Sequence, residues 1–174
     1  MKQMACVMVV LALVGVGCGK AKQAVGDKAT ELAIESAAKP EGKNVDVKVN
    51  SSSGSVQMTQ TTDGGKTTAA YGEGTKMPAD WPKDIPVPDG LALVTAQSTP
   101  EQGQFMITGT TAQPLDKVVA FIKEKIPAQG WKVETTMAVP GQTDTTIFKK
   151  DDRNLNVTAN VEDGKTAIVL SVSK

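Results

Sequence analysis

One segment of this chain has a clear helical repeat, and the segments on both sides of it alternate between apolar and polar residues. Its helical face consists of apolar residues spaced three or four apart, with charged residues on the opposite side: Leu115, Val118, Val119, Ile122 and Ile126. Such a face must be buried against another layer, and the neighbouring segments have the period of β-strands. The sequence therefore predicts one amphipathic helix packed on a sheet.

Six strands are predicted around this helix. Two precede it, and four follow it from Trp131 onward, separated by short turn sequences rich in Asp and Gly: 91–97, 104–110, 131–137, 145–149, 155–161 and 168–172. The order is β-β-α-β-β-β-β. We therefore expect residues 91–174 to form an α+β domain in which a curled antiparallel sheet packs on the single helix.

A second group of shorter strands is predicted within residues 44–76. Val45, Val47 and Val49 alternate with polar residues, and two more short strands follow, at 56–59 and 67–71. Three short strands make a small meander that is only marginally stable by itself. Its Ser, Thr and Gln side chains fit either an exposed sheet face or hydrogen bonding to a polar ligand.

A proline-rich joint, residues 77–90, connects the meander to the main domain. Four prolines within eleven residues exclude a helix and favour an extended, polyproline-like path. Trp81, Ile85 and Val87 are the apolar side chains of interest in this joint. They either form an interaction surface for a partner protein or brace the joint against the main domain.

The N-terminus has the layout of a secretory signal peptide. Lys2 is followed by an uncharged stretch from Met4 to Gly17, which is too short to cross a bilayer as a helix. Residues 1–17 are therefore predicted to be removed after export. Residues 18–43, rich in Ala, Lys and Glu, are predicted to form a helical tether, with an interaction helix as the alternative.

The end of this leader, from Val14 to Cys18, resembles the lipobox of bacterial lipoproteins. The resemblance implies cleavage between Gly17 and Cys18 and attachment of acyl chains to the Cys18 thiol, although Gly15 stands where Leu is usual. Two or more acyl chains give durable anchoring, so the membrane is the first expected partner. Gly19 is not the Asp that retains such proteins at the inner membrane, which implies the outer membrane, with the domain facing the periplasm.

Composition excludes most catalytic and metal chemistry. The chain has no histidine, and both cysteines, Cys6 and Cys18, lie in the first eighteen residues. A Ser-His or Cys-His pair, an imidazole metal ligand and a redox cysteine pair are therefore absent from the sequence of the predicted domain. The 19 basic and 19 acidic residues balance, so we expect no nucleic-acid partner. No cofactor, metal or enzymatic activity is predicted.

The main domain resembles the helix-grip arrangement of some envelope lipoproteins and assembly factors. Segments 81–86, 116–121 and 130–131 also resemble a pattern that recurs in uncharacterised bacterial lipoproteins. The main functional hypothesis is a lipid-anchored, non-catalytic envelope lipoprotein that contacts an envelope protein or the cell wall. The alternative is a binding module for a small or extended ligand between helix and sheet, with Trp131, Phe121 and Phe105 either as its apolar wall or simply as core residues.

Overall fold

The computed structural model describes residues 44–50, 54–62 and 65–174. The predicted signal peptide, Cys18 and the predicted tether lie outside these residues. Within the described part of the chain, no helix is both long and apolar enough to span a membrane.

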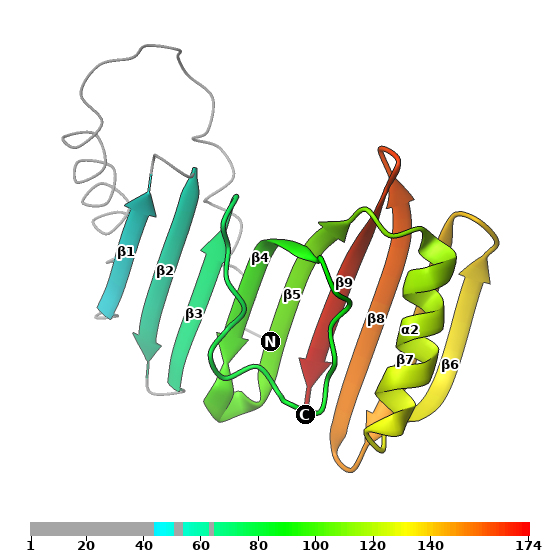
Figure 1. Cartoon of the computed structure of the whole chain (residues 1–174). Coiled ribbons are helices and arrows are strands. Elements are labelled where there is room, and N and C mark those ends of the chain that lie inside the picture. The colour runs from blue at the N-terminus through cyan, green and yellow to red at the C-terminus, as the bar shows by residue number, and fades with distance from the viewer. Residues whose placement is uncertain (1–43, 51–53, 63–64) are drawn as a thin grey trace.

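Nine antiparallel strands form one open sheet (Figure 1). The strands are β1 (Asn44–Asn50), β2 (Ser55–Thr62), β3 (Gly65–Tyr71), β4 (Ala92–Thr99), β5 (Gln104–Thr111), β6 (Lys132–Val139), β7 (Thr143–Lys150), β8 (Arg153–Glu162) and β9 (Lys165–Ser173). Their spatial order is β1-β2-β3-β4-β5-β9-β8-β7-β6, which leaves β1 and β6 at the two edges. The predicted order of elements along the main domain, β-β-α-β-β-β-β, is confirmed, and the meander extends the same sheet because β3 pairs with β4.

The helix α2 (Leu115–Ala128) connects β5 to β6 and lies across one face of the sheet (Figure 1). Its predicted apolar face is confirmed, since Val118, Ile122 and Ile126 are buried. Pro114 lies immediately before the helix, at its N-cap position. The helix continues through Pro127, and Gly130, at φ +88°, then closes it by donating its N–H to the Pro127 carbonyl at 2.9 Å.

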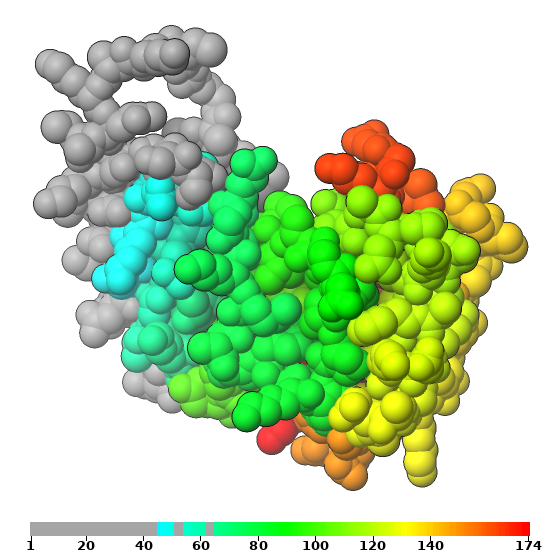
Figure 2. Space-filling model, in the orientation of Figure 1, coloured from blue at the N-terminus to red at the C-terminus, as the bar shows by residue number. Residues whose placement is uncertain are grey.

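Residues 72–91, which we call the strap, cover the same face of the sheet as α2. The strap descends in front of β4, crosses the sheet and returns to start β4 (Figure 1). In Figure 2 the strap and α2 hide most of β8 and β9 behind them, so that only the ends of these strands are visible. The prolines had predicted an extended path, but the strap is not extended throughout. It turns where the Trp81 N–H donates to the Pro78 carbonyl and where the Ile85 N–H donates to the Pro82 carbonyl, each at 3.1 Å.

A single hydrophobic core lies between the sheet and the cover formed by α2 and the strap. It contains residues from all three parts: Ile85, Ala96, Ile107, Val118, Ile122, Ile126, Trp131, Phe148, Leu155, Val157, Ala159, Ile168, Leu170 and Val172. The strands contribute every second residue to this core, as expected for a sheet buried on one face.

The apolar side of the sheet changes face between β3 and β4. Val47 pairs with Met58, Met58 with Ala69 and Ala69 with Gln97, so these four side chains share one face. Ala96, the neighbour of Gln97, belongs to the core and points to the opposite face. The valines of β1 therefore lie on the face opposite α2, where Val47 is only 3% exposed.

Candidate functional site

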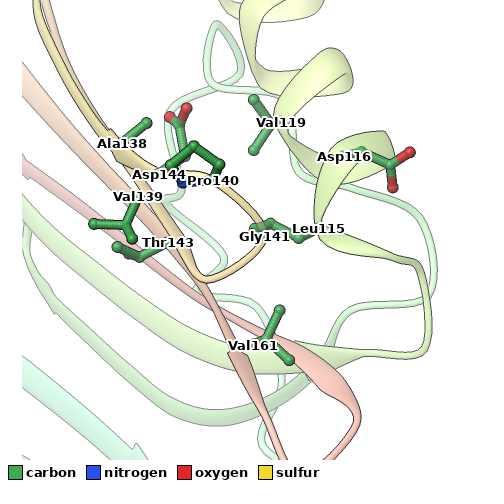
Figure 3. A pocket seen from close by; sticks show the side chains of 10 residues that line it. All are labelled: Leu115, Asp116, Val119, Ala138, Val139, Pro140, Gly141, Thr143, Asp144 and Val161. Atoms are coloured by element: carbon green, nitrogen blue, oxygen red, sulfur yellow. The ribbon is translucent and has the colours of Figure 1, made fainter.

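A cleft lies between the first turns of α2 and the hairpin that joins β6 to β7 (Figure 3). Its volume is about 430 Å³. The lining comes from α2, from the hairpin and from the end of β8: Leu115, Asp116, Val119, Ala138, Val139, Pro140, Gly141, Thr143, Asp144 and Val161. Most of these side chains are apolar, so the cleft offers an apolar surface to a small molecule.

The position of β6 explains why this cleft is open. The main contacts of α2 with the sheet are with β8, and β6 lies beyond it at the edge of the sheet. All eight residues of β6 are exposed, among them Met137 at 59% and Val139 at 47%. The edge strand therefore projects past the helix, and the space between the two is left unfilled.

The polar part of the cleft is a buried carboxylate with two partners. Lys123 donates from its ammonium to Asp144 Oδ2 at 2.8 Å, and Thr146 donates from its hydroxyl to Asp144 Oδ1 at 2.9 Å. The Asp144 side chain is 9% exposed, whereas that of Lys123 is 44% exposed. The carboxylate of Asp116 points away from the hairpin (Figure 3). Asp144 in one wall of the cleft is thus paired with Lys123, which lies outside the lining and is accessible to solvent.

The polar residues that line the cleft are few. Its polar residues are Asp116, Thr143 and Asp144, and the Thr143 hydroxyl already donates to the Ala159 carbonyl at 3.2 Å. In the described segments, no cluster of three or more His, Cys, Asp or Glu side chains could hold a metal ion. The cleft therefore offers a ligand mainly apolar contacts.

A second polar cluster fixes the strap to the far end of the sheet. Arg153 binds Asp84 in a bidentate manner, with Nη1 3.1 Å from Oδ1 and Nη2 2.5 Å from Oδ2. Lys150 Nζ donates to the same Oδ2 and to the Gln129 carbonyl, both at 2.7 Å. These hydrogen bonds, first those from Arg153, lower the pKa of Asp84 from 3.8 to about 2 against the opposing effect of partial burial, and the Arg153 pKa is raised in turn.

Trp131 lies directly beside this cluster. Its indole Nε1 donates to the Asp84 carbonyl at 2.9 Å, and the Arg153 guanidinium carbon is 4.8 Å from the centroid of its ring. At 2% exposed, Trp131 is part of the core. The cluster is therefore a structural anchor that joins the strap, the end of α2 and the turn between β7 and β8.

The strap residues predicted as an interaction surface lie against the core. Ile85 is 2% exposed, and Trp81 and Val87 are partly buried against the core. Trp81 also meets Phe105 edge to face, at 6.2 Å between ring centroids, and donates from Nε1 to the Ile85 carbonyl at 3.0 Å. This packing is that of the brace, one of the two roles expected for the joint. Recognition of these residues by a partner stays an untested prediction.

A cleft lies between α2 and the β6–β7 hairpin, but the aromatic residues predicted as the wall of a ligand cleft are not part of it. None of Trp131, Phe121 and Phe105 lines it. Trp131 lies beyond the C-terminal end of α2, whereas the cleft is at the N-terminal end. Gly17 and Cys18, the predicted cleavage and lipid-attachment residues, lie outside the described residues.

The sequence interpretation missed the hairpin residues Ala138–Gly141. A signal for them was present, since Met137 and Val139 continue the alternation of the strand and Pro140-Gly141 is a typical turn pair. The sequence did not show that β6 lies at the edge of the sheet, because that position is set by the pairing of β9 with β5.

A comparison with protein-family models matches residues 93–165 to a START domain-like family. The match runs from β4 to the first residue of β9 and includes α2, but not β1–β3 or the strap. It covers fewer than half of the residues of the chain. Comparison with curated proteins gives no match, and comparison with solved structures gives none. The matched region, with one helix held against an antiparallel sheet, has a helix-grip-like fold.

Proposed function

We propose that this chain is a non-catalytic binding protein that holds a small, mostly apolar ligand in the cleft between α2 and the β6–β7 hairpin. The observation that carries the proposal is the cleft itself, about 430 Å³ in volume and lined mainly by aliphatic side chains. Ligand pockets of globular proteins have volumes of roughly 300–1,000 Å³ and the same apolar character. The similarity of residues 93–165 to a START domain-like family supports a domain in which helix and sheet enclose the site.

The lining also suggests where in the cleft a polar group of the ligand would lie. Leu115, Val119 and Val161 offer aliphatic contacts, while Asp144 brings the ammonium of Lys123 close to one wall. A ligand with an apolar body and one hydrogen-bond acceptor would match this distribution, because the acceptor could take a hydrogen bond from the exposed ammonium. A ligand with several charges would bind poorly, because its charged groups would lose water without gaining partners of opposite charge.

The test of this proposal is to isolate the full protein from its own cells and to extract and identify any apolar small molecule bound to it. We expect a molecule in near-stoichiometric amount that is absent from an Ala138→Trp variant prepared in parallel. Recovery of the same molecules, in the same amounts, from both proteins would contradict the proposed site.

We further propose that the protein acts in a bacterial cell envelope, held in the outer membrane by acyl chains on Cys18 and facing the periplasm. The support is the lipobox-like end of the leader, with Gly17 and Cys18 at the predicted cleavage point. Contact with an envelope protein or the cell wall is part of this proposal. A Cys18→Ala variant should lose incorporation of a labelled fatty acid and leave the membrane fraction. An unchanged amount of the variant in the membrane fraction would contradict lipid attachment at Cys18.

A further inference from the structure

A second hollow lies on the sheet face opposite α2. Its volume is about 240 Å³, and strands β3, β4, β5 and β9 surround it. The lining residues are Thr67, Gln97, Ser98, Thr99, Gln104, Phe105, Met106, Ser171, Val172 and Ser173.

The strand register places this hollow on the outer face. Gln97 pairs with Met106 and Met106 with Ser171, so these side chains point the same way. Their neighbours Ile107 and Leu170 point into the core beneath α2 and the strap. The hollow is therefore separated from the cleft by the thickness of the sheet.

The chemistry of this lining is uniform, because no residue in it carries a charge. Hydroxyl and amide side chains on the outer face form the polar part, and Met106 adds an apolar surface. Phe105 and Val172 also border the hollow, but the register turns their side chains toward the core. Thr67 and Thr99 hydroxyls lie 3.0 Å apart across the strands. Phosphate, carboxylate or ammonium groups would find no opposite charge among these residues, whereas a neutral ligand with many hydroxyls would find donors and acceptors throughout.

An aromatic ring is fixed next to the hollow. The Gln97 amide Nε2 donates to the Tyr71 phenol oxygen at 2.7 Å, and Tyr71 is 37% exposed. Tyr71 pairs with Thr95 and lies on the same face as Gln97. The hydrogen bond restrains the ring, so an apolar face and a polar tip are available beside the uncharged lining.

We propose that this hollow binds a neutral saccharide unit. Hydroxyl and amide side chains would take the sugar hydroxyls, and the faces of Tyr71 and Met106 would cover its C–H surface. The volume of about 240 Å³ lies below the range of drug-sized pockets and fits one sugar ring better than a large ligand. A free oligosaccharide and a residue of an insoluble glycan chain share this chemistry, and the experiment separates the two sources.

The experiment uses the full protein in a detergent without a sugar headgroup. Saturation-transfer NMR would measure binding of the tetrasaccharides of glucose and of N-acetylglucosamine, with a tetrasaccharide of galacturonic acid as the anionic control. Sedimentation with cellulose and chitin would measure binding to insoluble chains. We expect binding to at least one neutral probe and none to the anionic one. Binding in sedimentation alone would identify a glycan chain as the source.

Two variants test the position of the site, with a matched control on the same face. Tyr71→Ala and Gln97→Ala should each weaken binding by about tenfold or more. Thr158→Ala should leave binding unchanged, because Thr158 pairs with Thr145 at 3.1 Å on a part of the face outside the hollow. Absence of binding to every neutral probe would overturn the proposal, as would preference for the anionic probe or equal binding by all three variants. Ligand binding in the cleft is measured separately, so either proposal can fail alone.

Discussion

The guanidinium of Arg153 lies 4.8 Å from the ring centroid of Trp131 while it grips both carboxylate oxygens of Asp84. Trp131 in turn binds the Asp84 carbonyl through its indole N–H. Three segments that are far apart in the sequence therefore meet at one point: the strap, the end of α2 and the start of β8. This anchor positions the strap over the sheet and fixes one end of α2.

Replacing Asp84 by Asn should destabilise the fold by about 2 kcal/mol near neutral pH, because the amide keeps one acceptor oxygen but lacks the negative charge and the second oxygen to which Arg153 and Lys150 donate. Urea unfolding of the two proteins measures this difference. Asp80→Asn is the control, since Asp80 lies in an exposed turn of the same strap and should change stability little. Equal stability of Asp84→Asn and the parent protein would contradict the structural role of the anchor.

The stability contributed by Asp84 should depend on pH in the acid range. Its pKa is about 2 in the folded protein, against an ordinary 3.8, so the folded state favours the ionised form. That stabilisation is fully present above the ordinary pKa and is lost as the pH falls toward about 2. The parent protein and Asp84→Asn should therefore differ near about pH 6 and converge near about pH 2. If the difference in free energy of unfolding between the two proteins did not shrink in acid, it would not arise from ionisation of Asp84.

Arg153→Lys should also destabilise, although the positive charge is kept. A lysine ammonium cannot bind both oxygens of Asp84 in parallel, and it has no planar group to stack on Trp131. We expect a loss of about 1 kcal/mol in thermal or urea unfolding, and a larger loss for Arg153→Ala. If Arg153→Lys were as stable as the parent protein, the bidentate and stacked geometry would contribute nothing beyond charge.

Ile85→Ala tests whether the strap is part of the core. Ile85 is 2% exposed, so its truncation should leave a cavity and cost about 2–4 kcal/mol. Val94→Ala is the matched control, because Val94 is 47% exposed and should cost less than about 0.5 kcal/mol. Similar unfolding midpoints for both variants would contradict the brace.

The main domain could be predicted from the sequence because its signals are local. The repeat from Leu115 to Ile126 fixes the helix, and the alternation from Leu155 to Val161 fixes a strand with one buried face. Both depend only on neighbours along the chain.

The placement of the apolar meander face could not be predicted in the same way. The alternation of Val45, Val47 and Val49 predicts a strand but not the face of the sheet on which the valines lie. That face is set by pairing of β3 with β4, where Ala69 meets Gln97 rather than a core residue. The anchor is similar, because Asp84 and Arg153 are 69 residues apart and no spacing rule connects them.

The most direct test of the proposed function is titration of the full protein with the neutral apolar dye Nile red, in the parent protein and two variants. Ala138→Trp fills the cleft, while Met137→Trp places the same side chain on the opposite face of β6, since Ala138 pairs with the cleft residue Asp144 and Met137 with Thr145. Any dye bound by acyl chains on Cys18 would be the same in all three proteins, because none of the variants changes that residue. We predict saturable binding that is lost in Ala138→Trp and kept in Met137→Trp; equal binding by the two variants would contradict a ligand site in the cleft.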